Sequence, residues 1–145
     1  MNMIQNLDKA CEILSAGNYT CVACCGDISY TATDRGVAPL MNWLDSGIDL
    51  RGFSAADRVV GRATAFLYVL LGVKAVSARV MSKPAAEVLS SYGIFTRADK
   101  MVDGIINRKG DGPCPFESAV MGITDAQQAL AAIREKRAQM RKESN

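Results

Sequence analysis

Three side chains with chemical potential stand out in the sequence: the thiol of Cys114 and the carboxyl groups of Glu117 and Asp57. Cys114 lies in GPCPFE, just before a short helix expected near Pro115, where a helix dipole lowers a thiol pKa and favours the thiolate. Because histidine is absent, Glu117 or Asp57 would have to act as the base or orient the nucleophile. The alternative is an inert thiol in a turn made rigid by two prolines.

A second group of residues is expected to bind a ligand rather than to react. They lie at predicted helix starts, at a predicted strand end and in the turn-rich segment 107–117: Ser54, Arg58, Met81, Ser82, Asn107 and Arg108. Crevices at helix N-termini and strand ends favour anions, and arginines bind phosphates and carboxylates. The alternative is that the arginines are ordinary surface bases. Asp34 and Arg35 are interpreted as solvated loop charges, with a ligand contact as the alternative.

The cysteines do not resemble a disulfide framework. Their number is five, and three of them crowd into residues 21–25. An odd count without a secretion signal favours reduced thiols. In a strand, Cys21 and Cys25 would share one face while Cys24 lies on the other, so Cys21 and Cys24 would not converge on one metal ion. We therefore predict packing thiols, no metal site and no bound cofactor.

Hydrophobic periodicity and capping residues predict the elements that position these residues. Ser54 is predicted to cap a long buried helix that ends at Gly72, with Asp57 supporting that cap. The other predicted elements are a helix over 1–16, a hairpin of 19–25 and 28–33, a short helix from Gly36 to Ser46, a buried strand over 73–80, a helix from Ser82 to Gly93, a weak edge strand over 94–102 and a final helix from Thr124 to about Met140.

Length and composition favour one domain spanning residues 1–145, because 49% hydrophobic residues are ample for a single core. The basic tail is expected as a solvated helix end, or as disordered from about residue 138. A net charge of +2 is too small to predict nucleic acid as a partner. The N-terminus lacks a signal peptide and the apolar run 63–71 is too short to cross a bilayer, so a cytoplasmic protein without a membrane partner is expected.

The order of elements predicts an α/β protein, a three-layer α/β/α sandwich with a mixed sheet of about four or five strands. This layout is similar to the cytidine deaminase-like fold. The segments TCVACCGDISYTATDRGVAPLMNWL, GFSAADRVVGRATAFLYVLLGVKAV, ARVMS and GIINRKGDGPCPFE resemble the prokaryotic family catalogued as domain of unknown function eighteen ninety-three. The resemblance extends from about Leu14 to Ile133. It implies the deaminase-like fold but no particular activity.

The zinc motif of the deaminases is missing under this resemblance. Those enzymes place a His or Cys ligand two residues before a catalytic Glu at a helix start, and two further Cys ligands in a PCxxC turn. Aligned on the predicted helix starts, Ala55, Ser82 and Ala85 occupy the ligand positions, and Asp57 replaces the Glu. Hydrolytic deamination through zinc is therefore not expected.

Two kinds of function remain open from the sequence. The first is binding of a small anionic or nucleotide-like ligand in the cleft, with a thiol-dependent enzyme using Cys114 as a variant of it. The second is a non-catalytic oligomeric scaffold, for which a homodimer is the expected form by analogy with deaminase-like folds.

Overall fold

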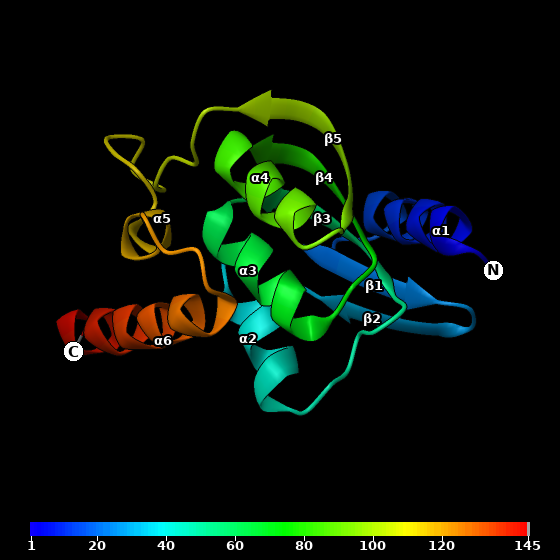
Figure 1. Ribbon diagram of the computed structural model, residues 1–145, viewed down its shortest axis with the longest axis horizontal. Coiled ribbons are helices and arrows are strands. Elements are labelled where there is room, and N and C mark those ends of the chain that lie inside the picture. The colour runs from blue at the N-terminus through cyan, green and yellow to red at the C-terminus, as the bar shows by residue number, and fades with distance from the viewer. Residues whose placement is uncertain (145) are drawn as a thin grey trace.

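A five-stranded mixed sheet forms the centre of the fold, in the order β2-β1-β3-β4-β5 (Figure 1). The computed structural model describes residues 1–144, and its strands are β1 (Cys21–Cys25), β2 (Ile28–Ala32), β3 (Ser54–Val60), β4 (Ala75–Ser82) and β5 (Phe95–Val102). Strand β1 pairs antiparallel with β2 and β3, whereas β3, β4 and β5 are parallel. The α/β class, the mixed sheet, the hairpin and the edge position of 94–102 are thus confirmed.

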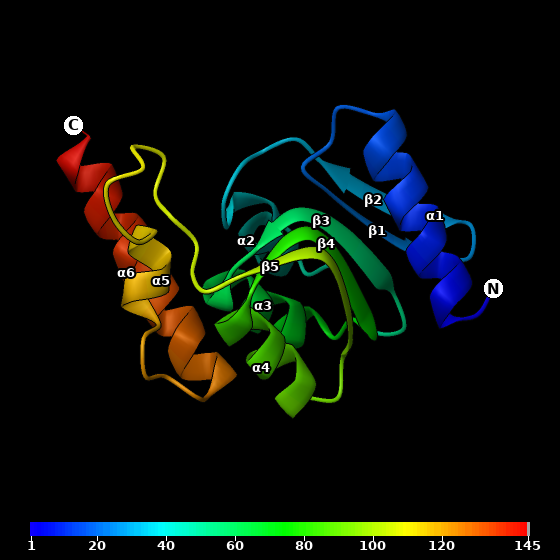
Figure 2. The same ribbon diagram turned by 90° about the horizontal axis from the view of Figure 1, so that it is seen from above.

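Helices flank both faces of this sheet. Figure 2 shows α1 (Met3–Ala16) on one side and α3 (Arg62–Leu71) and α4 (Lys83–Ser91) on the other. The remaining helices are α2 (Ala38–Asp45), the five-residue α5 (Pro115–Ala119) and α6 (Ala126–Glu143). Helix α6 packs against α3 and buries Ala126, Ala129 and Ile133. Within residues 1–144, no helix combines the length and the apolar character needed to span a membrane.

The hydrophobic core is divided by the sheet into two parts. The larger part lies between the sheet and the helices opposite α1, and it includes Cys21, Phe66 and Tyr68. The smaller part lies under α1 and includes Cys24 and Ala56. Cys21 and Cys24 thus lie on opposite faces, as the alternation predicted. All five cysteines are free thiols.

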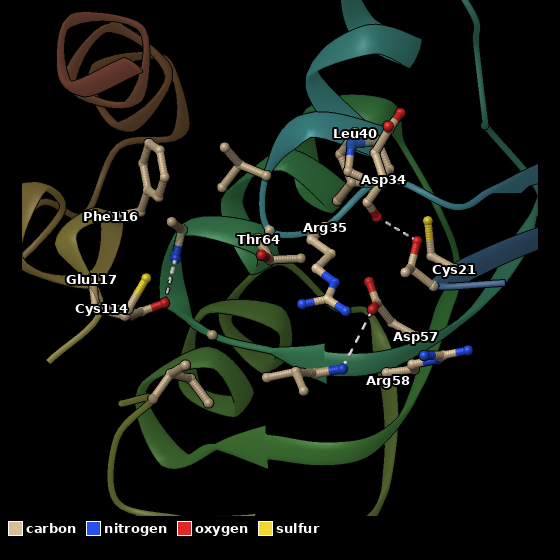
Figure 3. Close-up of a pocket in the computed structure, with 18 of the residues that line it drawn as sticks. Cys21, Asp34, Arg35, Leu40, Asp57, Arg58, Thr64, Cys114, Phe116 and Glu117 are labelled. Carbon is tan, nitrogen blue, oxygen red and sulfur yellow. Dashed lines mark hydrogen bonds between the residues drawn. The ribbon is translucent and has the colours of Figure 1, made fainter. Parts of the chain in front are cut away.

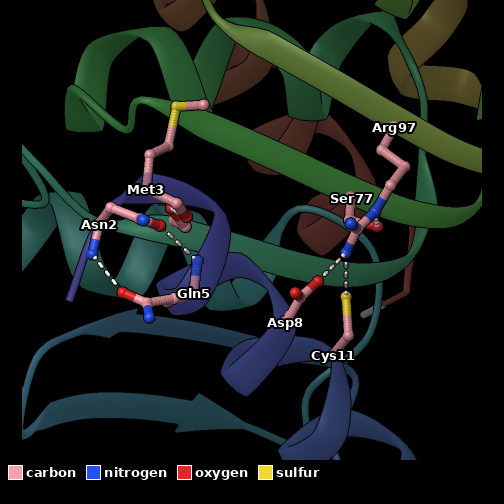
Figure 4. A network of polar contacts seen from close by, with 8 residues as sticks. Asn2, Met3, Gln5, Asp8, Cys11, Ser77 and Arg97 are labelled. Atoms are coloured by element: carbon pink, nitrogen blue, oxygen red, sulfur yellow. Dashed lines mark hydrogen bonds and ion pairs between the residues drawn. The ribbon is translucent and has the colours of Figure 1, made fainter.

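Helix α1 is tied to the parallel half of the sheet by Arg97 on β5 (Figure 4). The Arg97 guanidinium donates to the Asp8 carboxylate at 3.0 Å, to the Cys11 sulfur at 3.4 Å and to the Ser77 hydroxyl at 3.3 Å. These contacts explain why a charged residue occupies an edge strand: it pairs with polar groups of the covering helix.

The predicted helix over 54–72 was wrong in its first half. Ser54–Val60 is the central strand β3, and the helix begins only at Arg62, after Gly61. Ser54 therefore caps no helix; its hydroxyl donates to the Met3 carbonyl at 2.9 Å. Strand β3 is covered on both faces, so its residues show no alternation. Of the two alanines that suggest a helix, Ala56 packs under α1 and Ala55 packs in the opposite core.

Candidate functional site

A cavity of about 340 Å³ lies where β3 ends, between the loop before α2, the first turn of α3 and the segment 105–117 (Figure 3). Ends of parallel strands next to helix N-termini are where α/β proteins usually bind ligands. Its wall combines charged, hydroxyl, thiol and apolar side chains: Thr20, Cys21, Asp34, Arg35, Val37, Pro39, Leu40, Asp57, Arg58, Val59, Ala63, Thr64, Ile105, Arg108, Cys114, Phe116 and Glu117, together with Gly36 and Gly61.

Asp57 is the acid at the inner end of the cavity. The Tyr68 hydroxyl donates to its Oδ2 at 2.7 Å, and the Val59 amide donates to its Oδ1 at 3.4 Å. Desolvation by the surrounding core raises the pKa of Asp57 from 3.8 to about 7, although the hydrogen bond from Tyr68 acts in the opposite direction. Asp57 therefore exchanges a proton near neutral pH, which fits an acid or base role.

Cys21 and Tyr68 form the buried side of the same site. Cys21 lies opposite Asp57 in the β1–β3 register, and both Cys21 and Tyr68 are almost fully buried. Burial, followed by the charge of Asp57, raises the pKa of the Cys21 thiol and of the Tyr68 hydroxyl. Both groups thus stay protonated, and Tyr68 serves as a fixed donor to the Asp57 carboxyl group.

Three arginines are among the residues that line the cavity: Arg35, Arg58 and Arg108. Figure 3 shows the Arg35 guanidinium pointing into the cavity, toward Asp57. Arg35 and Arg58 also line an adjoining hollow. Within the described residues, none of the three is in a salt bridge, and the buried Nε of Arg58 has no hydrogen-bond partner. Such guanidinium groups are well suited to an anionic ligand.

Glu117 reaches the cavity from α5 and contacts the start of α3. Its Oε2 accepts from the Arg62 amide at 2.9 Å, and its Oε1 lies 3.4 Å from the Ala63 amide. Burial raises the pKa of Glu117, while these two amides counteract that shift. Gly61 makes the contact possible, because a Cβ there would lie 1.9 Å from Oε1.

Cys114 also lines the cavity, and its backbone amide donates to the Ile105 carbonyl at 2.9 Å. The helix that follows, α5, has only five residues, so the dipole offered to the thiol is weak. The Cys114 side chain is half-buried, and no base is hydrogen-bonded to its sulfur within the described chain. Its assignment as a nucleophile stays a prediction.

Five of the predicted site residues come together in this cavity, namely Asp57, Arg58, Arg108, Cys114 and Glu117. Four others lie outside its wall, and each has an evident structural contact. Met81 is buried in the core, the Ser82 hydroxyl caps α4 by accepting from the Ala85 amide at 3.2 Å, and Asn107 closes its own turn by accepting from the Gly110 amide. Ser54, the fourth, lies at the far end of β3 beneath α1.

The sequence interpretation missed several cavity residues. Thr20, Cys21 and Thr64, which line the cavity, and Tyr68, which donates to Asp57, were not predicted, and Arg35 was interpreted as a solvated loop charge. A signal for Arg35 was present, since a charged pair precedes a helix start there. The other four have none, because their proximity arises from strand pairing and from the packing of α3 on the sheet.

The comparison with deaminase metal positions requires correction for the same reason. Ala55 is the second residue of β3 rather than part of a helix start, whereas Ser82 and Ala85 lie at the start of α4, so the three do not surround one cleft. Among residues 1–144, no three His, Cys, Asp or Glu side chains gather as metal ligands. The donor set of the cavity therefore does not fit a three-ligand zinc centre.

Comparisons with known proteins agree on the fold. The crystal structure of a DUF1893 family protein, TM1506 from Thermotoga maritima, is similar with a TM-score of 0.83 at 24% identity, covering 91% of this chain and 90% of that chain. No curated protein matches the sequence. The family model described as domain of unknown function, DUF1893 (TM1506), matches residues 9–137. The chain therefore belongs to the DUF1893 family.

Proposed function

We propose that this protein binds a small ligand carrying an anionic group, such as a nucleotide, in the cavity at the end of β3. The observation that carries the proposal is the set of three arginines without salt-bridge partners in the described chain, Arg35, Arg58 and Arg108, around one cavity. Guanidinium groups bind phosphate or carboxylate through paired hydrogen bonds. Arg35 is the principal contact, because it points into the cavity (Figure 3).

The remainder of the wall supports a ligand with an apolar or planar part. Leu40, Ile105 and Phe116 supply apolar surface, and Thr20 and Thr64 supply hydroxyl groups. The volume of about 340 Å³ lies within the range of small-molecule sites, roughly 300–1,000 Å³. A cavity of this composition accommodates a heterocycle against the apolar wall and an anionic group against the arginines.

Asp57 adds proton transfer to this binding site. With a pKa of about 7, it is partly protonated at neutral pH and both donates and accepts a hydrogen bond. A divergent enzyme using Asp57 as acid or base is therefore the catalytic form of the proposal. The layout of helix, hairpin and alternating helices and strands is compatible with a deaminase-like scaffold whose chemistry differs from zinc hydrolysis.

The test is a binding screen with inorganic phosphate, the four common nucleoside 5′-monophosphates and the corresponding nucleosides, read by thermal shift and calorimetry. A true ligand raises Tm progressively with its concentration, with the logarithm of that concentration once it exceeds Kd. Arg35→Ala should weaken binding of the best ligand at least about tenfold, as expected for a lost charged hydrogen bond. Arg141→Ala on α6 removes the same charge outside the cavity and serves as the matched control.

The oligomeric scaffold is the competing outcome of the same experiment. A native mass measurement that finds a stable homodimer, together with no Tm shift for any anion or nucleoside, would favour that function and contradict the ligand site. Binding that survives Arg35→Ala unchanged would contradict the assignment of Arg35 to the anionic group.

A further inference from the structure

We propose that the N-terminus of α3 is an anion site within this cavity, and that Glu117 is its built-in occupant, which the anionic group of a ligand displaces. The inference rests on the proposed function and adds to it where that group binds and what it competes with. The chemical class is a phosphate or carboxylate group, since both present oxygens to backbone amides.

The first turn of α3 is open to the cavity. Gly61, Ala63 and Thr64 all line it, and α3 is ten residues long, enough for an aligned set of peptide dipoles. Free amides and the positive end of the dipole favour an anion at this place. In the structure the amides of Arg62 and Ala63 hold the Glu117 carboxylate.

Thr64 supplies an independent donor for the same site. Its side chain is only 9% exposed, and no hydrogen-bond partner for its hydroxyl is found among residues 1–144. Threonines within helices commonly bond back to a carbonyl of the preceding turn, which Thr64 does not do. Thr64 is nine-tenths buried and lines the cavity, so its hydroxyl, which has no protein partner within the described residues, is available to hydrogen-bond a ligand atom there.

Glu117 is an exchangeable occupant because the segment that carries it is weakly anchored. No residue of α5 is fully buried, and the first buried residue after it is Val120. Segments with few buried contacts open at low cost. Burial also raises the pKa of Glu117, which means that keeping the carboxylate charged in this position costs desolvation free energy. A stronger anion, positioned by the arginines of the cavity, can therefore replace it.

Inorganic phosphate is the probe that tests this exchange, with affinity measured by calorimetry and the Arg62 and Ala63 amides followed by NMR. Glu117→Gln keeps the shape of the side chain but removes the competing charge. It should bind phosphate about fivefold or more tightly, because phosphate no longer competes with a charged carboxylate for the α3 amides. Glu87→Gln, on the exposed side of α4, is the matched control and should bind as the wild type does.

Thr64 variants provide the second measurement. Thr64→Val should weaken phosphate binding about threefold or more in both the wild-type and Glu117→Gln backgrounds, since a hydrogen bond to an anion is lost. Thr64→Ser keeps the hydroxyl and should restore the affinity. In the wild type, phosphate should also increase hydrogen exchange in α5, because the displaced segment opens.

The inference would be overturned if Glu117→Gln bound phosphate no more tightly than the wild type, or if phosphate left the Arg62 and Ala63 amide signals unchanged. Failure of the proposed function can be distinguished from failure of this inference. If Glu117→Gln and Thr64→Val have the expected effects while Arg35→Ala has none, the α3 site stands without the arginine site. If only Arg35→Ala matters, the arginine site stands and Glu117 is a structural cap.

Discussion

At the scale of single residues, the chemistry of the cavity depends on Asp57. Its carboxyl group lies in a mostly apolar wall, with the buried Tyr68 hydroxyl as its fixed donor. Neither neighbour in the sequence explains the raised pKa; the cause is the core packed around the end of β3. A carboxyl group whose pKa lies near neutral pH is suited to transfer protons at pH 7.

This environment predicts how stability depends on pH. Because the pKa of Asp57 in the folded protein, about 7, lies above the ordinary value of 3.8, the folded state binds more protons than the unfolded state between these values. Its contribution to stability is complete below about pH 4 and is lost as pH rises through 7, by at most about 1.4 kcal/mol for each pKa unit. Asp57→Asn should remove this slope.

The measurement is the free energy of unfolding by urea at several pH values from 4 to 8, for the wild type and Asp57→Asn. Asp99→Asn, an exposed carboxylate on β5, is the control and should keep the wild-type slope. Equal slopes for wild type and Asp57→Asn would show that Asp57 titrates normally in the folded protein.

At the scale of elements, α3 differs from α1, α4 and α6 in how it begins. Helices α1, α4 and α6 are capped by side chains at their own N-caps, Asn2, Ser82 and Asp125. The N-cap of α3 is Gly61, and its first amides are satisfied by Glu117, which is 55 residues away in the sequence. This long-range cap joins the segment 103–124 to the helix and closes one side of the cavity.

This cap is predicted to require glycine at position 61. Gly61→Ala should displace the Glu117 carboxylate, whose Oε1 would lie 1.9 Å from the new Cβ, and cost about 1–2 kcal/mol of stability, the usual value of a lost cap. In a Glu117→Ala background the same substitution should cost less, because the carboxylate it collides with is gone. Chemical unfolding of the two single variants and the double variant gives this coupling.

Gly104→Ala is the matched control for that cycle. It lies in the same segment, and a Cβ there would meet no atom within 4 Å. Its effect should stay within about 0.5 kcal/mol of the wild type. Additive effects of Gly61→Ala and Glu117→Ala would contradict the proposed contact.

At the scale of the whole molecule, α6 decides whether the chain folds as one unit. It follows the segment 103–124 and packs on α3, and Ile133 is completely buried at that contact. The core that Ile133 joins is the same one that contains Phe66 and Trp43. We therefore predict that α6 unfolds together with the sheet rather than as an appendage.

Ile133→Ala should lower stability by about 2–5 kcal/mol, the range for a large-to-small substitution in a core. Fluorescence of Trp43, the single tryptophan, and far-ultraviolet circular dichroism should report one coincident transition before and after the change. Ala131→Gly on the exposed side of α6 is the control and should cost about 1 kcal/mol. Separate transitions for the two probes would contradict a single cooperative unit.

Local signals in the sequence determined most of the elements. The end of α1 near Gly17, the hairpin at Gly26-Asp27, the Ser82 cap and the edge strand β5 were all predicted, because each depends on residues within a few positions. Asp57, Glu117 and Cys114 were also identified as site candidates from their type and neighbours. Their meeting in one cavity is a matter of tertiary structure.

Tertiary structure alone decided the central strand and the composition of the site. Ser54–Val60 has alanines and a capping pattern that favour a helix, but burial between α1 and the opposite core makes it a strand. The true helix start at Arg62 has no local capping residue, because its cap is Glu117, brought from far along the chain. The start of α3 could not be predicted from nearby residues, because the contact with Glu117 that replaces a local cap exists only once the chain has folded.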